Sequence, residues 1–177
     1  MTTPAYDNQT RNEVAIKLAR IRPARPDWLD REFQIGRQLP AGDARYGFPQ
    51  MIEYGAYQGH HFLASEILGP SVQNLLEYCG NGFDVKSIVM IARKTMLCLE
   101  QMHIRGLIHH DIKPHNMVLS DKGNKLYLID FGLSQLIDPN AQTQRFAGTL
   151  QFAAHTALND ERKSPFALPF PSRFENK

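Results

Sequence analysis

Two short stretches in the second half of the chain stand out: HHDIKPHN at residues 109–116 and IDFG at residues 129–132. The first contains an aspartate, a lysine and an asparagine at intervals of two and three residues, and the second contains an aspartate directly after an apolar run. Phosphoryl transfer needs metal ions that neutralise the phosphates, an acceptor for the hydroxyl proton, and cations around the transferring group. The polar residues of these two stretches include all three kinds of group.

The spacing assigns a role to each polar side chain. Asp111 lies in a loop where it can orient the substrate hydroxyl, and Lys113 can reach the γ-phosphate. Asn116 and Asp130 offer oxygen atoms to magnesium from neighbouring turns. Two unrelated polar turns around a hairpin are the alternative. The pattern H-x-D-x-K-x-x-N followed by a hairpin and D-F-G strongly favours the catalytic interpretation.

Together the two stretches resemble the catalytic loop and the metal-binding motif of protein kinases, which implies ATP and Mg²⁺ as cofactors. The resemblance extends toward the N-terminus. VAIK at residues 14–17 matches the strand whose lysine, here Lys17, grips the α- and β-phosphates. Glu32 matches the glutamate that pairs with that lysine, and it lies on a helix expected over residues 28–39 after an Asp27 cap.

A further stretch, SEILGPS at residues 65–71, resembles the linker between the two kinase lobes, where backbone groups of Glu66 and Leu68 would contact adenine. The letters LGPS, with FAGT at residues 146–149, are similar to the casein kinase 1 group, which includes the vaccinia-related and tau-tubulin kinases. Like that group, the chain has no APE triplet. The resemblance covers roughly residues 12–158 and implies a serine/threonine kinase that acts on a protein substrate.

Several features depart from the family pattern. No glycine precedes Gly36, so the glycine-rich loop over the phosphates is absent, and there is no room for its first strand or its turn. His110 replaces the arginine usual before the catalytic aspartate. Gly36 lies one helical turn after Glu32, where the family packs a bulky residue. After Leu158 the family continues with buried helices, whereas this chain continues with a tail rich in proline and phenylalanine over residues 159–177.

The expected fold is therefore α+β and kinase-like, with two lobes, an incomplete sheet in the small lobe and a truncated helical large lobe. Residues 1–68 would form the partial small lobe and linker, residues 69–158 the partial large lobe with both catalytic loops, and residues 159–177 a divergent tail. Residues 1–12 are polar and show no periodicity, so they are expected to be a frayed start.

Local patterns predict the remaining elements. The longest is a helix from an Asp84 cap to about Ile104, which is apolar on more than one side and therefore expects cover from more than one neighbour. The others are a strand over 14–18 covered on both faces, two strands at 50–57 and 60–67, a helix from Ser71 to Tyr78, and a hairpin of residues 117–119 and 126–129.

Composition limits the possible partners and location. A formal net charge of +2 is too mild to indicate nucleic-acid binding, and no apolar stretch approaches the length needed to span a membrane. Cys79 and Cys98 lie far apart without a metal-binding pattern. His109, His110 and His115 crowd one loop, but their spacing suits no closed zinc site. The expectation is a cytoplasmic or nuclear protein.

Two further hypotheses stand beside an active kinase. The catalytic residues favour an enzyme, whereas the missing glycine-rich loop and helices favour a catalytically impaired remnant or pseudokinase that binds nucleotide or a protein. Such a protein partner would cover the large lobe. The abrupt change after Leu158 also fits an incomplete gene model.

Overall fold

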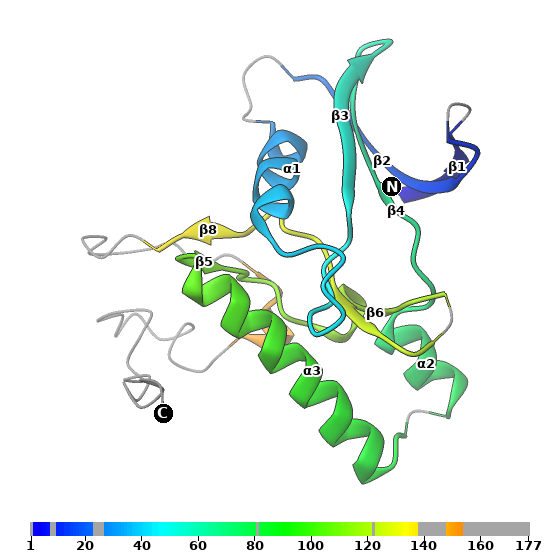
Figure 1. The fold of residues 1–177 in the computed structure, drawn as a ribbon, viewed down its shortest axis with the longest axis vertical. Helices are drawn as coiled ribbons and strands as arrows, with labels where there is room; N and C mark the ends of the chain where they lie inside the picture. Colours follow the sequence, from blue (N-terminus) through cyan, green and yellow to red (C-terminus); the bar gives the residue numbers. More distant parts are fainter. Residues whose placement is uncertain are drawn as a thin grey trace.

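The computed structural model describes residues 2–7, 10–22, 27–80, 82–121, 123–137 and 148–153 of the 177-residue chain. Helices and strands are both present, as expected for an α+β protein. Their order is β1 (Thr2–Tyr6), β2 (Glu13–Arg20), α1 (Trp28–Gln38), β3 (Met51–Tyr57), β4 (His60–Glu66), α2 (Val72–Tyr78), α3 (Val85–Ile104), β5 (Leu107–Ile108), η1 (Pro114–Asn116), β6 (Met117–Leu119), β7 (Leu126–Leu128), β8 (Gln135–Leu136) and η2 (Leu150–Phe152). Figure 1 shows the sheet and α1 at one end of the molecule and α2 and α3 at the other.

Four strands form an antiparallel sheet in the order β1-β2-β4-β3. The turn between β3 and β4 lies at Gln58 and Gly59, as predicted, and both residues have positive φ angles, 46° and 76°. β2 pairs with β4 so that Lys17 lies opposite Leu63. α1 packs against β3 and β4 and so comes close to the strand that carries the lysine (Figure 1).

Two expectations about the first two strands were wrong. Thr2–Tyr6 pairs with β2, so a strand lies where a frayed start was expected. The sequence of this strand lacks an alternation of apolar and polar residues. As an edge strand, β1 tolerates Pro4, and its Tyr6 is 57% exposed. β2 was expected to be covered on both faces, but its Leu18 is 48% exposed. The turn between β1 and β2 contains no glycine.

The three α-helices in the described part of the chain begin where the sequence predicted their caps. Asp27, Ser71 and Asp84 each accept a hydrogen bond from a backbone amide in the first turn of the helix that follows. A side-chain oxygen at this position satisfies a donor that the helix itself cannot pair. The cap at Asp27 fixes the start of α1, the helix that carries Glu32.

The main core lies between α1, α3 and the segments around β5 and β7, and consists of Ile35, Leu39, Phe48, Cys98, Met102, Leu107, Leu128 and Phe131. The loop after α1 packs closely against this core. The Gly47 carbonyl accepts hydrogen bonds from the Leu128 amide at 2.9 Å and the Cys98 thiol at 3.5 Å. A Cβ on Gly47 would collide with the backbone of Leu126 and Tyr127, so glycine is required for this contact.

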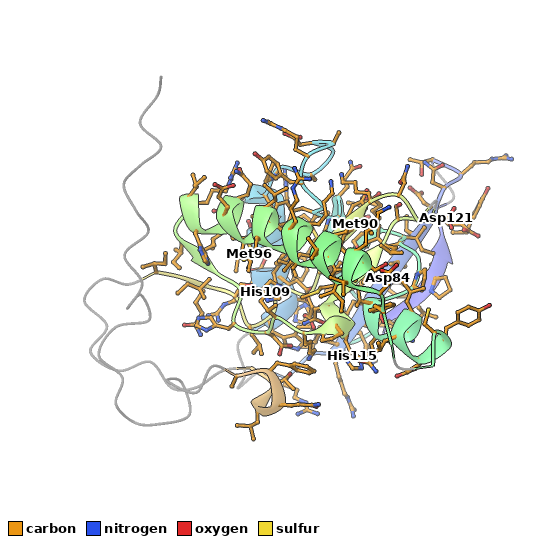
Figure 2. The ribbon with its side chains drawn as sticks, turned by 90° about the horizontal axis from the view of Figure 1, so that it is seen from below. Asp84, Met90, Met96, His109, His115 and Asp121 are labelled. Atoms are coloured by element: carbon orange, nitrogen blue, oxygen red, sulfur yellow. The ribbon has the colours of Figure 1, made fainter. Side chains whose placement is uncertain are left out.

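α3 is buried along one side only. Thr95, Cys98 and Met102 are buried, whereas several apolar side chains elsewhere on the helix are more than half exposed: Val85, Ile88, Val89, Met90, Met96 and Ile104. This confirms that the helix is apolar on more than one side. Figure 2 shows Met90 and Met96 on α3, away from His109 in the loop behind it. No helix among the described residues is long and apolar enough to cross a membrane.

Candidate active site

Asp111 is held by three donors. Lys113 Nζ donates to its Oδ2 at 2.6 Å, Asn116 Nδ2 donates to the same oxygen at 3.1 Å, and the Thr149 hydroxyl donates to Oδ1 at 2.6 Å. The side chain is 7% exposed. Burial raises the pKa of the Asp111 carboxyl, but the hydrogen bonds from these donors outweigh burial and hold that pKa below its ordinary value. The Asp111 carboxyl is therefore ionised at neutral pH and can accept a hydrogen bond from a hydroxyl group.

His109 connects the two loops that the sequence singled out. Its Nδ1 accepts the Asp111 amide at 3.2 Å, so its Nε2 carries the proton and donates to the Ile129 carbonyl at 3.1 Å. The ring also meets Phe131 edge to face, with centroids 5.7 Å apart. Burial lowers the pKa of His109 to about 4. With a neutral ring and both nitrogens hydrogen-bonded, His109 links the two loops.

Lys17 lies between two carboxylates. Its Nζ donates to both oxygens of Glu32, at 2.8 and 2.9 Å, and to Asp130 Oδ1 at 3.2 Å. Burial lowers the pKa of Lys17, but the two carboxylates outweigh burial and raise that pKa overall. The lysine is therefore a fixed cation. β2, α1 and the loop after β7 supply one side chain each, so this contact joins three separate segments of the chain.

Asp130 and Asn116 are the candidate metal ligands. Asp130 has a φ of 67°, a conformation uncommon for residues other than glycine, and its side chain is 40% exposed. Asn116 uses its Nδ2 to donate to Asp111, so its Oδ1 is the atom available to a cation. The described residues contain no group of three or more His, Cys, Asp and Glu side chains that could hold a metal alone. The donor set fits a hard cation that completes its shell with phosphates and water.

The linker after β4 contains the two residues expected to contact adenine. The Glu66 amide donates to the Gln50 carbonyl at 2.9 Å, and the Glu66 carboxylate accepts from the Tyr127 hydroxyl at 3.2 Å. The linker is therefore anchored on both sides. In the described part of the chain, the backbone of Leu68 enters none of the loop hydrogen bonds. Its N–H and C=O are free to meet a ligand.

Gly36 has a partner that the sequence did not indicate. The Met51 side chain, from β3, fills the space beside this glycine, because a Cβ on Gly36 would lie within 2.7 Å of Met51 Cγ. Met51 packs against the core that contains Phe131. The bulky group that the family places on the helix is thus replaced by a methionine from the neighbouring strand.

His110 differs from the arginine of the family in more than charge. It has a φ of 68°, and its Nε2 is buried without a hydrogen-bond partner among the described residues. Burial lowers the pKa of His110, so the ring is neutral at pH 7. It cannot provide the forked cation that an arginine would offer to a phosphate.

The predicted site residues form two clusters and a linker. Lys17, Glu32 and Asp130 make the first cluster, Asp111, Lys113 and Asn116 the second, and Glu66 and Leu68 lie in the linker. Sequence reasoning also missed the contact that Thr149 makes. Thr149 appeared only as part of FAGT, yet its hydroxyl donates to Asp111 and accepts from Lys113 Nζ at 3.1 Å. Nothing local could reveal a contact across 38 residues.

Comparison with protein-family models matches residues 2–167 to a model described as "Protein kinase domain". The match covers nearly the whole chain. It includes both clusters, the linker, Thr149 and the N-terminal strand β1.

Proposed function

Because this chain belongs to the protein kinase family, we propose that it transfers the γ-phosphate of ATP to a serine or threonine hydroxyl of a protein substrate, with magnesium as the metal. One observation carries the proposal. The Thr149 hydroxyl lies 2.6 Å from Asp111 Oδ1 and 3.1 Å from Lys113 Nζ. The proposed proton acceptor and the proposed phosphate-binding cation are thus held together by a third side chain, as two groups that act on one transferring phosphate must be.

The proposed chemistry follows from these positions. Asp111 accepts a hydrogen bond from the substrate hydroxyl and receives its proton as the oxygen attacks the γ-phosphorus. The bond between that phosphorus and the β,γ-bridging oxygen breaks, and ADP leaves. Lys113 balances the charge on the transferring group. The low pKa of the Asp111 carboxyl keeps it ionised before the reaction, as an acceptor must be.

The nucleotide would lie between the two clusters. Lys17, fixed by Glu32, would contact the α- and β-phosphates, and the backbone of Glu66 and Leu68 would contact adenine. Asn116 and Asp130 would hold the metal. Magnesium, when bound, neutralises the phosphates and aligns them for transfer. Asp130 would then exchange its contact with Lys17 for the metal.

The finer classification is part of the proposal. LGPS at residues 68–71 and FAGT at 146–149 support the casein kinase 1 group. A cytoplasmic or nuclear location is proposed with this assignment.

A second candidate is a catalytically impaired kinase or pseudokinase that serves as a binding module. The observation that favours it is the lack of glycine before Gly36, which removes the flexible cover that excludes water from the phosphates. Residues 7–12, between β1 and β2, contain no glycine either.

Phosphoamino-acid analysis separates these candidates. The purified chain is incubated with labelled Mg-ATP and casein, beside Asp111→Asn as the catalytic control. Label on serine or threonine that Asp111→Asn removes supports the kinase. Binding of Mg-ATP without transfer, equal in both proteins, supports the binding module, and label on tyrosine contradicts the proposed specificity.

A further inference from the structure

The chain contains one tryptophan, and it lies beside the lysine of the first cluster. Trp28 is the first residue of α1, and Lys17 Nζ lies over its ring, 5.4 Å from the centroid. At this separation an ammonium group is attracted to the face of an aromatic ring. The three N–H groups of Lys17 are matched by two oxygens of Glu32 and one of Asp130. The ring adds an attraction that needs no further donor.

The same ring lies against the turn that follows β7. A Cβ on Gly132 would be 3.4 Å from Trp28 Cε3 and 3.5 Å from Asp130 Oδ1, which is van der Waals contact with both. The space beside this glycine is therefore bounded by the tryptophan ring and by the candidate metal ligand. Trp28 is thus close to the backbone that carries Asp130 as well as to the lysine.

The backbone that carries Trp28 is fixed by the residue before it. Asp27 Oδ1 accepts hydrogen bonds from two amides in the first turn of α1. Asp27 Oδ2 accepts from the Tyr54 hydroxyl and lies 3.0 Å from His61 Nδ1, and these two residues lie on β3 and β4. The start of α1 is thereby tied to the sheet, so the ring of Trp28 extends from a fixed point.

The contribution of Trp28 is to this cluster and not to the main core. Its side chain is 43% exposed, and it is not among the residues that form the core. The ring covers part of Lys17, whose side chain is 19% exposed. Water excluded from the neighbourhood of a cation strengthens the electrostatic interactions of that cation.

We propose that Trp28 is a positioning residue for the nucleotide phosphates and that it acts through Lys17. In the proposed nucleotide complex Asp130 leaves Lys17, so the ammonium group loses one of its three acceptors. The ring holds the ammonium group in place during this exchange, and it does not compete with a phosphate for the N–H groups. This inference rests on the proposed function, because it assigns Trp28 to the ATP site. No motif in the sequence marked this residue.

Nucleotide binding tests the proposal. Trp28→Leu, which keeps apolar bulk without a ring, should weaken Mg-ATP binding about tenfold, whereas Trp28→Phe should weaken it only about two- to threefold. Affinity for adenosine should not change in either variant, because adenosine has no phosphates for Lys17 to contact. Calorimetry measures both ligands. Tyr78→Leu is the matched control, since Tyr78 is 90% exposed at the end of α2 and should bind both ligands as the wild type does.

A second measurement needs no nucleotide. If Trp28 acts through Lys17, the two side chains are energetically coupled in the free protein. Trp28→Leu should therefore lower the urea midpoint of unfolding less in a Lys17→Met background than in the wild type. Methionine keeps the length of the lysine stem and removes the charge that the ring attracts.

Three results would overturn the proposal. Equal Mg-ATP affinity in the wild type and Trp28→Leu would show that the ring does not act on the phosphates. Equal losses for Mg-ATP and adenosine would show that the ring only supports the fold. Additive effects of Trp28→Leu and Lys17→Met would show that the ring does not act through the lysine. Failure of the proposed function is distinguishable from these results, because a wild type that binds Mg-ATP without transferring phosphate contradicts the transfer and not the role of Trp28.

Discussion

The Thr149 hydroxyl donates a 2.6 Å hydrogen bond to Oδ1 of Asp111, across 38 residues of sequence. Lys113 and Asn116 hold the other carboxylate oxygen. The orientation of the proposed proton acceptor is thus shared between its own loop and a distant segment. A carboxylate held at both oxygens cannot rotate freely, and its alignment with a substrate hydroxyl is set in advance.

Replacing Thr149 tests this relationship. Thr149→Ala should lower kcat by about 10- to 100-fold, because Asp111 loses the donor at Oδ1 and its alignment. Thr149→Ser keeps the hydroxyl and should retain most activity. Steady-state kinetics on casein at saturating ATP measure the effect. Full activity in Thr149→Ala, with an unchanged melting temperature, would show that Asp111 is oriented without it.

Asp130 should control metal-dependent nucleotide binding. Asp130→Asn removes an anionic ligand, so the affinity for Mg-ATP should fall by about 10- to 100-fold. Affinity for ATP without metal should not fall, because no metal is lost and a negative charge near the phosphates is removed. Calorimetry with and without Mg²⁺ measures both values. Asp121→Asn, in the exposed β6–β7 turn, is the control, and equal Mg-ATP affinity in wild type and Asp130→Asn would refute the assignment.

His109 should make stability depend on pH. Its pKa is about 4 in the folded chain against an ordinary 6.5, so between these values the unfolded chain binds a proton that the folded chain does not. Stability from this group is therefore complete above pH 6.5 and falls as the pH drops to 4, by about 3 kcal/mol in total.

Urea unfolding at several pH values checks this expectation. His109→Gln should show a shallower loss of stability between pH 6.5 and 4 than the wild type. His115→Gln, which replaces an exposed histidine of the same loop, should follow the wild type. If the free energy of unfolding falls with pH in parallel for the wild type and His109→Gln, the pKa of His109 is not lowered by folding.

Gly36 and Met51 should depend on each other. Gly36→Leu places a large side chain where Met51 lies, and overpacking of this kind costs about 1–3 kcal/mol. Met51→Ala alone leaves a cavity and should also destabilise the fold. The double variant should be more stable than the sum of the two single changes predicts, as measured by thermal unfolding. Strict additivity would show that the two side chains do not share one space.

The α+β, kinase-like fold was predictable because its signals are local. Asp27, Ser71 and Asp84 begin helices through contacts within one turn, and the two catalytic stretches contain most of their site in a few residues. The family match over residues 2–167 confirms the protein kinase assignment. The residue ranges of the two lobes stay predictions, and the tail at 159–177 lies outside the described residues.

What the sequence did not reveal depends on distant contacts. β1 has no alternating pattern, and its pairing with β2 is what defines it as a strand. The contact between Thr149 and Asp111 depends on the folded arrangement of the residues between them, which include β6, β7 and β8. Met51 reaches Gly36 from another element, and no pattern in either segment indicates this.

The close packing of Met51 against Gly36 also limits how this protein could have diverged from its relatives. A bulky residue at position 36 and a small one at position 51 should each destabilise the fold alone and compensate for each other in part. If the two positions changed one at a time from a bulky residue on the helix, the chain would pass through a less stable intermediate. The two positions should therefore covary among its descendants, with glycine at 36 inherited together with a long, unbranched side chain at 51.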